Sequence, residues 1–270
     1  LTPNLEHLTL GGKELEMILH AEFQGNHLYK LKVLTLLFHI ESDVFLLQVL
    51  NIDKLVVCDG SFKENFCFDS HNVDEAGLLS QLKMLCLHFL PELVSNGLEN
   101  SWIEPFLRNL ETLEVISCFS SINLVPCTVF LSNLTFLKVQ DCSSLLYWFT
   151  SSTAKRLGQL KRMKIISCTL IEEIVSKEGD ESNEDEIIFP QLNCLNLEYL
   201  PKLRNFFKGS LSFPSLEILS VIGCYRMGTL CPGTIKADKL LEVKLEWLSN
   251  PISLKIDLNS TLQKELLRTR

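Results

Sequence analysis

The sequence lacks the motifs that mark several common classes of enzyme and metalloprotein. No C-x-x-C pair occurs among its ten cysteines, so the ligand spacing of a structural zinc site is missing. It contains no G-x-x-x-x-G-K-[ST], G-x-S-x-G or H-E-x-x-H motif, which excludes the best-known phosphate-binding loops, nucleophile elbows and zinc-protease sites. We therefore expect no catalytic residues, no cofactor or cofactor-binding residues and no metal ligands in this segment.

Long uncharged apolar runs are also absent. The most apolar stretch, residues 31–50, carries the polar side chains Lys32, His39, Glu41 and Asp43. A segment that carries these charged and polar side chains is not expected to span a membrane. The chain starts at Leu1 without an initiator Met or a basic-then-apolar leader, so we expect a fragment of a longer protein with no secretory signal in view.

The sequence also has fewer basic residues than acidic ones, 25 against 33. The formal net charge is −8, and contacts to phosphate groups need a basic surface. We therefore do not expect a general nucleic-acid binder.

What the chain does contain is a nine-residue pattern, apolar-x-x-apolar-x-apolar-x-x-Cys. Near-identical copies occur at residues 110–118, 134–142, 160–168 and 216–224. This pattern is the leucine-rich-repeat signature, L-x-x-L-x-L-x-x-N/C. Four copies make it a specific signal, because one short apolar pattern arises easily by chance.

Looser copies extend the repeat along the whole chain. The first apolar residues of the signatures are Leu5, Leu31, Ile52, Leu82, Leu110, Leu134, Leu160, Leu192, Leu216 and Leu240. Their average spacing, about 26 residues, lies in the usual range of about 20–29. We predict an α/β leucine-rich-repeat solenoid of about ten coils over residues 1–260, with a parallel concave sheet and an irregular or short-helical convex face. Residues 261–270 are predicted to form a capping helix or tail.

Within each signature, we number positions from the first apolar residue. Alternation predicts a short strand whose side chains at +3 and +5 enter the core, while those at +2, +4 and +6 face outward. The residue at +8 is predicted to lie buried beneath the turn that follows the strand. Cysteine occupies this position in the four clear copies, Cys118, Cys142, Cys168 and Cys224.

The return paths carry their own apolar pattern. Residues three and six places after position +8 are predicted to anchor the convex side, as in Leu145, Trp148, Ile171, Ile174, Leu203, Phe206, Met227 and Leu230. Phe189-Pro190 and Phe213-Pro214 each precede the next signature. We predict that these Phe rings stack on their counterparts in neighbouring coils.

The longest repeat contains an acidic segment at residues 176–186. Its many carboxylates cannot pack into a core, so we predict a solvated loop. The D-x-D-x-D-G order of a calcium loop is absent, so no metal site is expected there.

The cysteines bear on the cellular compartment. Their use at one repeat position is unlike a disulfide framework, and buried reduced thiols suggest a reducing environment. We expect a cytoplasmic, intracellular location.

The outward ladder is the surface that a solenoid offers to partners. Its central repeats combine an aromatic side chain with basic ones in an otherwise acidic protein, a composition typical of interface hot spots. The candidate partner-binding residues are Glu114, Phe136, Lys138, Arg162, Lys164, Asn196 and Glu198. The competing interpretation is that these charges only keep the sheet soluble.

Several segments resemble the leucine-rich-repeat region of plant intracellular nucleotide-binding disease-resistance proteins, especially the coiled-coil subclass. They are IEEIVS at 171–176, IFP at 188–190, CSSL at 142–145 and DLNSTLQ at 257–263. The resemblance covers the chain well from about Leu110 onward, and the earlier part only as generic repeats. It implies a non-enzymatic recognition and regulatory segment in plant defence.

The resemblance also implies partners. They would be a pathogen effector or a guarded host protein, and the nucleotide-binding switch module that family members carry upstream. No phosphate-binding loop occurs here, so that module's residues carry over to no position of this chain. Two alternatives stay open: an adaptor such as the substrate-binding arm of a ubiquitin ligase, and, less favoured, an extracellular receptor ectodomain.

Overall fold

The computed structural model describes residues 4–11, 13–14, 30–37, 52–59, 81–90, 109–118, 131–178, 186–245 and 258. The predicted capping helix at 261–270 and most of the acidic segment lie outside the described residues. The repeat signatures, and the return paths of the later coils, fall within them.

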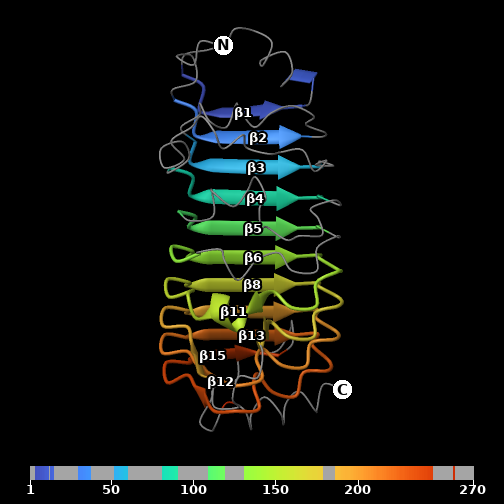
Figure 1. The fold of residues 1–270 in the computed structure, drawn as a ribbon, viewed down its shortest axis with the longest axis vertical. Helices are drawn as coiled ribbons and strands as arrows, with labels where there is room; N and C mark the ends of the chain where they lie inside the picture. The colour runs from blue at the N-terminus through green and yellow to red at the C-terminus, as the bar shows by residue number, and fades with distance from the viewer. Residues whose placement is uncertain are drawn as a thin grey trace.

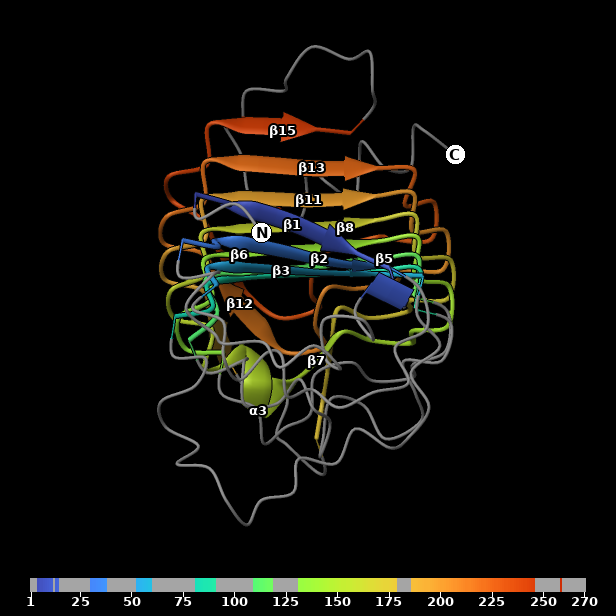
Figure 2. The same cartoon turned by 90° about the horizontal axis from the view of Figure 1, so that it is seen from above.

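One parallel sheet runs the length of the molecule. It contains ten strands in chain order, and each begins two residues after a predicted repeat start (Figures 1 and 2). The strands are β1 (His7–Leu10), β2 (Val33–Leu37), β3 (Lys54–Cys58), β4 (Met84–His88), β5 (Thr112–Ile116), β6 (Phe136–Gln140), β8 (Arg162–Ile166), β11 (Cys194–Glu198), β13 (Ile218–Ile222) and β15 (Glu242–Lys244). The predicted leucine-rich-repeat solenoid is confirmed.

The predicted alternation of side chains is also present. At +3 and +5, Leu113, Val115, Leu137 and Val139 are fully buried in one continuous core. The strands align without offset, so that Leu137 lies opposite Leu113 on one side and Met163 on the other. Burial of a full-sized aliphatic side chain contributes about 1.5–3 kcal/mol. The repeated Leu positions therefore supply the main stabilising term of the stack.

Backbone hydrogen bonds join each coil to the next at both ends of its strand. Before the strand, the Glu111 carbonyl accepts from the amides of Thr135 and Phe136, at 2.8 and 3.0 Å. After the strand, the Ser117 amide donates to the Gln140 carbonyl at 2.8 Å. The same two patterns recur along the sheet and hold neighbouring coils in one register.

The strand is followed by a residue with left-handed backbone at position +7. Its φ lies between 52° and 65° in Asp59, Phe89, Ser117, Asp141, Ser167, Tyr199 and Gly223. This conformation turns the chain inward and places residue +8 in the core, where Cys118, Cys142, Cys168 and Cys224 are buried. The Cys224 thiol donates to the carbonyl of Leu197 in the preceding coil at 3.4 Å. The predicted structural role of these cysteines is confirmed.

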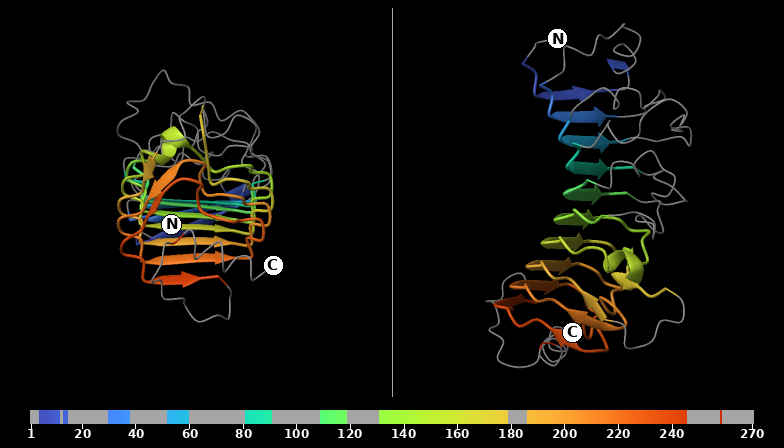
Figure 3. Two further views of the ribbon diagram at one scale, coloured as in Figure 1. Left: turned by 90° about the horizontal axis from the view of Figure 1, so that it is seen from below. Right: turned by 60° about the vertical axis from the view of Figure 1, so that its left-hand side comes forward.

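In the part of the chain described between residues 131 and 245, the side opposite the main sheet is built largely from short extended segments (Figures 2 and 3). One small sheet contains β10 (Glu186–Ile188), β12 (Ser210–Ser212) and β14 (Ile235–Lys236), and another pairs β7 (Phe149–Thr150) with β9 (Val175–Ser176). Within residues 131–178 and 186–245, α3 (Ser151–Ala154) is the one helix, so short strands outnumber helices in this part of the face. No helix in the described ranges is long and apolar enough to cross a bilayer.

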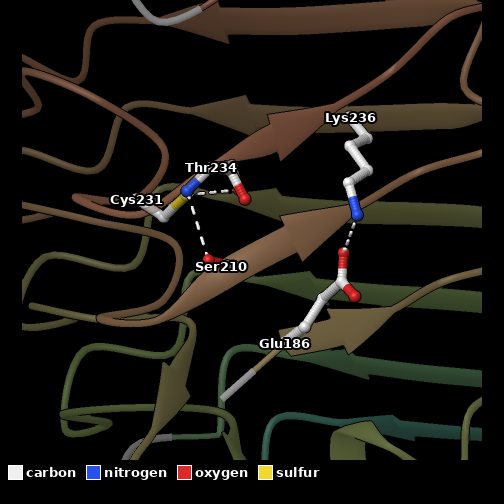
Figure 4. A network of polar contacts seen from close by, with 5 residues as sticks. All are labelled: Glu186, Ser210, Cys231, Thr234 and Lys236. Atoms are coloured by element: carbon white, nitrogen blue, oxygen red, sulfur yellow. Dashed lines mark hydrogen bonds and ion pairs between the residues drawn. The ribbon is translucent and has the colours of Figure 1, made fainter. Parts of the chain in front are cut away.

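Polar contacts tie the convex strands together (Figure 4). Lys236 on β14 pairs with Glu186 on β10 at 2.9 Å, reaching across β12 between them. The Thr234 amide donates to Ser210 Oγ at 3.2 Å. These contacts are exposed, so they fix the arrangement of the strands more than they add stability.

Beneath those strands, aromatic rings fill the space between the two faces. Phe189 and Phe213 stack with their centroids 5.6 Å apart, and Phe206 lies edge-on to both. All the predicted convex-side anchors are fully buried. The prediction of stacked Phe residues at the Phe-Pro positions is therefore confirmed.

Candidate functional site

The main sheet lines the concave side of the curved stack (Figure 3, right). Strand register arranges its outward side chains in three rows that cross β5, β6, β8 and β11. The rows contain Thr112, Phe136, Arg162 and Cys194 at +2; Glu114, Lys138, Lys164 and Asn196 at +4; and Ile116, Gln140, Ile166 and Glu198 at +6. The structure thus brings all seven candidate partner-binding residues onto one face of four adjacent strands.

Arg162 lies over the ring of Phe136. The two residues are register partners on β8 and β6, and the Arg162 guanidinium carbon is 5.5 Å from the ring centroid. A cation over an aromatic face at such a distance gains roughly 0.5–1 kcal/mol at an exposed site. Since Arg162 is exposed, its planar donor groups can still meet a carboxylate from outside.

Lys138 and Lys164 form a like-charged pair. They are register partners on β6 and β8, so their Cα atoms lie about one strand spacing apart, roughly 5 Å. Like charges directly opposite each other are unfavourable. Among the ion pairs between described residues, none includes Lys138, Arg162 or Lys164. An acidic surface placed over this pair would relieve the repulsion. We name Phe136, Lys138, Arg162 and Lys164 the basic patch.

The polar residues of β11 are bonded to one another. The Cys194 thiol donates to Asn196 Oδ1 at 3.2 Å, and Asn196 Nδ2 donates to Glu198 Oε1 at 3.0 Å. These two hydrogen bonds run along β11 and fix the side chains of Asn196 and Glu198 at the edge of the basic patch. Asn196 and Glu198 therefore border the patch with a defined orientation.

Glu114 borders the patch on the other side. It lies opposite Lys138 on β6 and opposite Cys86 on β4. Ligand atoms of Cys86, His88 and Glu114 all lie within 4.8 Å of one another. This cluster was not predicted from the sequence. Its one local signal is the C-x-H spacing in β4, which puts both side chains on the same face of a strand.

Burial dominates the protonation behaviour of the cluster. It raises the pKa of the Cys86 thiol to about 11, and the nearby Glu114 carboxylate adds to the rise. Burial also lowers the pKa of His88, against the opposing influence of Glu114. At neutral pH the cluster therefore holds a thiol and a neutral imidazole.

Farther along, the outward positions become less accessible. On β13, Ser220 and Ile222 are buried although their register places them on the concave side. Ile218 on the same strand stays exposed. The outward side chains of β6 and β8, where the basic patch lies, are by contrast half-buried or exposed.

Much of the chain is similar in sequence to plant disease resistance proteins. Residues 121–248 match the family described as plant disease resistance protein RPS2-like, leucine-rich repeats. The chain is 26% identical over 197 residues to the probable disease resistance protein At4g27220 of Arabidopsis thaliana, covering 69% of this chain and 20% of that relative. It is 27% identical over 126 residues to the probable disease resistance protein At5g63020 of the same plant, covering 45% of this chain and 14% of that relative. The chain thus spans a fifth or less of the length of these relatives.

Proposed function

We propose that this chain, which is a leucine-rich-repeat region of the plant disease-resistance type, recognises an acidic protein surface through the basic patch. The observation that supports the proposal most directly is Arg162 lying over Phe136 beside two lysines without ion-pair partners among the described residues. A positively charged, partly aromatic patch on a chain with net charge −8 is a local feature rather than a property of the whole surface.

The patch has two parts that would act differently in binding. Arg162 is held over the Phe136 ring, so less side-chain entropy is lost when it meets a carboxylate. Arg and aromatic residues are also the side chains that most often dominate interface energetics. Lys138 and Lys164 contribute through longer-range attraction, which accelerates association and weakens as salt is added.

The kind of partner proposed rests on the similarity to plant disease-resistance proteins. We propose that the patch binds the nucleotide-binding switch module of the longer protein in the resting state, and that a pathogen effector or a guarded host protein competes for the same face. In this proposal the segment is a non-enzymatic regulatory region in plant defence and works in the cytoplasm. Membership of the coiled-coil subclass stays a prediction.

The test uses triple charge reversal. The variant Lys138→Glu, Arg162→Glu, Lys164→Glu is mixed with the separately expressed switch module from the same full-length protein, and binding is measured by calorimetry at low and physiological salt. We expect the reversal to weaken binding at least tenfold, and added salt to weaken binding of the original chain more than that of the variant.

A matched control changes the same charge elsewhere. Lys202→Glu, Arg226→Glu, Lys239→Glu reverses three exposed residues outside the concave sheet and should leave binding unchanged. Arg162→Lys keeps the charge and removes the planar group, so it separates stacking from simple attraction. Equal binding by the original chain and by the patch variant would overturn the proposal.

A further inference from the structure

A second group of side chains on the concave face lies outside the basic patch. Cys86 and His88 point to the same face of β4 because they are two residues apart. Register places Cys58 of β3 opposite His88, and Glu114 of β5 opposite Cys86. Three adjacent strands therefore bring two thiols, an imidazole and a carboxylate into one diagonal array, with Cys58 and Glu114 at its two ends.

The distances within this array are short. Ligand atoms of Cys86, His88 and Glu114 lie within 4.8 Å of one another. Cys58 Sγ lies 3.8 Å from His88 Nδ1. In a tetrahedral zinc site with bonds of about 2.0–2.3 Å, ligand atoms are roughly 3.3–3.8 Å apart. Contraction by about 1 Å would bring the ligand atoms of Cys86, His88 and Glu114 to that geometry. Cys58 lies outside this group of three, beside His88, and its side chain would have to turn toward the ion to complete the site.

We propose that Cys58, Cys86, His88 and Glu114 bind a zinc ion that links three consecutive coils of the solenoid. Sulfur and imidazole ligands favour zinc over magnesium and calcium, which prefer sites made of oxygen atoms alone. Four protein ligands describe a closed, structural site rather than a catalytic one with an open position. This inference does not depend on the proposed function.

The surroundings of His88 agree with a ligand role. Its Nε2 atom is buried and has no hydrogen-bond partner within the described part of the chain. A buried polar atom without a partner costs roughly 1–3 kcal/mol. Rotation of the imidazole ring toward a bound metal would let one ring nitrogen ligate the ion. The same rotation would move the other nitrogen into a new environment.

The charges near the array also favour occupation. Two thiolates and a carboxylate carry three negative charges, and zinc leaves one uncompensated. Lys54 on β3 and Lys138 on β6 are close enough to influence the Cys86 thiol electrostatically, both in the direction that favours the thiolate. The cluster is therefore flanked by cations able to balance the loaded site.

The consequence would be mechanical. A metal held by β3, β4 and β5 would act as a cross-link between coils that otherwise contact only their sequence neighbours. The unfolded chain has no preformed site, so the metal would bind the folded chain alone. Its binding free energy would therefore add to the free energy of unfolding.

The first experiment uses cobalt as a spectroscopic substitute for zinc. The reduced 270-residue chain, stripped of metal, is titrated with Co²⁺. We expect one equivalent to produce thiolate-to-cobalt charge-transfer absorption and the d–d bands of tetrahedral coordination, and one equivalent of Zn²⁺ to abolish both. Absence of the charge-transfer band would overturn the proposal.

Variants then assign the ligands. Cys86→Ser, His88→Ala and Glu114→Gln should each weaken zinc binding by more than the roughly 10–100-fold that loss of an outer hydrogen-bond partner costs. Cys58→Ser should remove about half of the charge-transfer intensity, because each thiolate contributes to it. Undiminished intensity in that variant would contradict the place of Cys58 in the site.

The matched control is Cys194→Ser. Cys194 is a half-buried thiol on the same concave face but at β11, where it donates to Asn196. Zinc affinity should not change in this variant. A separate readout is the unfolding midpoint, which one equivalent of zinc should raise in the original chain and in Cys194→Ser but not in Glu114→Gln. Equal shifts in all three proteins would indicate adventitious binding and would also overturn the proposal.

Discussion

The Phe189 ring lies parallel to the Phe213 ring, with an interplanar angle of 14° and a centroid separation of 5.6 Å. Each ring precedes a proline and enters the core at the same point of its own coil. Phe206 meets both rings edge-on, at 5.7 and 5.9 Å. This three-ring cluster joins the concave and convex faces at the carboxyl-terminal half of the described repeats.

The cluster leads to a prediction about stability. Phe213→Ala should lower the free energy of unfolding by about 3–5 kcal/mol, because it removes a fully buried ring and leaves a cavity beside two others. Phe213→Leu should cost less, since much of the volume stays filled. Urea unfolding measures both values. The control, Leu241→Ala, truncates an exposed apolar side chain and should change stability by less than about 0.5 kcal/mol.

Much of this fold could be predicted because one rule repeats. A solenoid buries the same positions in every coil, so each copy of the pattern supports the others. All ten strands begin two residues after a predicted start, even where the signature is weak, as at Ile52. The four clear copies were enough to locate the less regular ones.

The left-handed turn at position +7 could not be predicted in the same way. Among the seven described residues with this backbone, Gly223 is the one glycine, while Phe89, Ser117 and Tyr199 adopt the same conformation. Without tertiary contacts, a residue that has a Cβ atom disfavours this left-handed backbone conformation. Here the amide of residue +7 bonds to the next coil, so tertiary contacts impose what the local sequence does not signal.

Gly223 offers a test of that turn. Its φ is +65°, and an added Cβ would lie 2.9 Å from Tyr199 Cδ1. Gly223→Ala should therefore reduce the free energy of unfolding by about 1–2 kcal/mol, from backbone strain and crowding together. Gly228 is the matched control, because an added Cβ there meets nothing within 4 Å. If thermal or urea unfolding shows equal effects for the two substitutions, the turn is not under the constraint described.

The candidate sites differ in how visible they are in the sequence. The basic patch follows from strand offsets, since each outward position is known once the repeat is found. The four-residue cluster around His88 is hidden, because Cys58 and His88 are 30 residues apart and belong to different coils. Register alone brings them together. Its members occupy the outward offsets +4 and +6, so the repeat register could have grouped them, whereas a search for metal-ligand motifs along the linear sequence does not.

The thiols provide a third prediction. Burial raises the pKa of Cys118 and of Cys224 to about 12, so both are protonated and inaccessible at pH 8. A brief exposure of the native chain to iodoacetamide should modify the half-buried Cys194 well before either of them. Mass spectrometry of peptides gives the order.

After unfolding without reductant, all ten thiols should be modified. Incomplete modification under those conditions would indicate disulfides and would favour the extracellular alternative over an intracellular receptor. Early modification of Cys118 or Cys224 in the native chain would instead contradict their place beneath the strand-ending turns.

The last prediction concerns pH. Glu178 Oε2 accepts from the Ser152 amide at 3.1 Å and from Ser151 Oγ at 3.4 Å, at the start of α3. Burial opposes ionisation, but the hydrogen bonds from Ser152 and its neighbours outweigh it and lower the pKa of Glu178 below that of an unfolded Glu side chain. A carboxyl whose pKa is lower in the folded state stabilises the fold above its unfolded pKa, and this contribution is lost as the pH falls through the folded value.

Glu178→Gln should therefore reduce the free energy of unfolding at pH 7 by about 0.5–1 kcal/mol, a small value because the site is partly solvated. The difference from the original chain should persist down to the unfolded pKa, about 4.3, and then shrink as the pH is lowered further. Urea unfolding between pH 7 and pH 3 measures it. Glu217→Gln, at an exposed position, should show no such dependence. A difference that grows on acidification would mean that Glu178 is bound more tightly in its protonated form, which is the reverse of what donors such as the Ser152 amide impose.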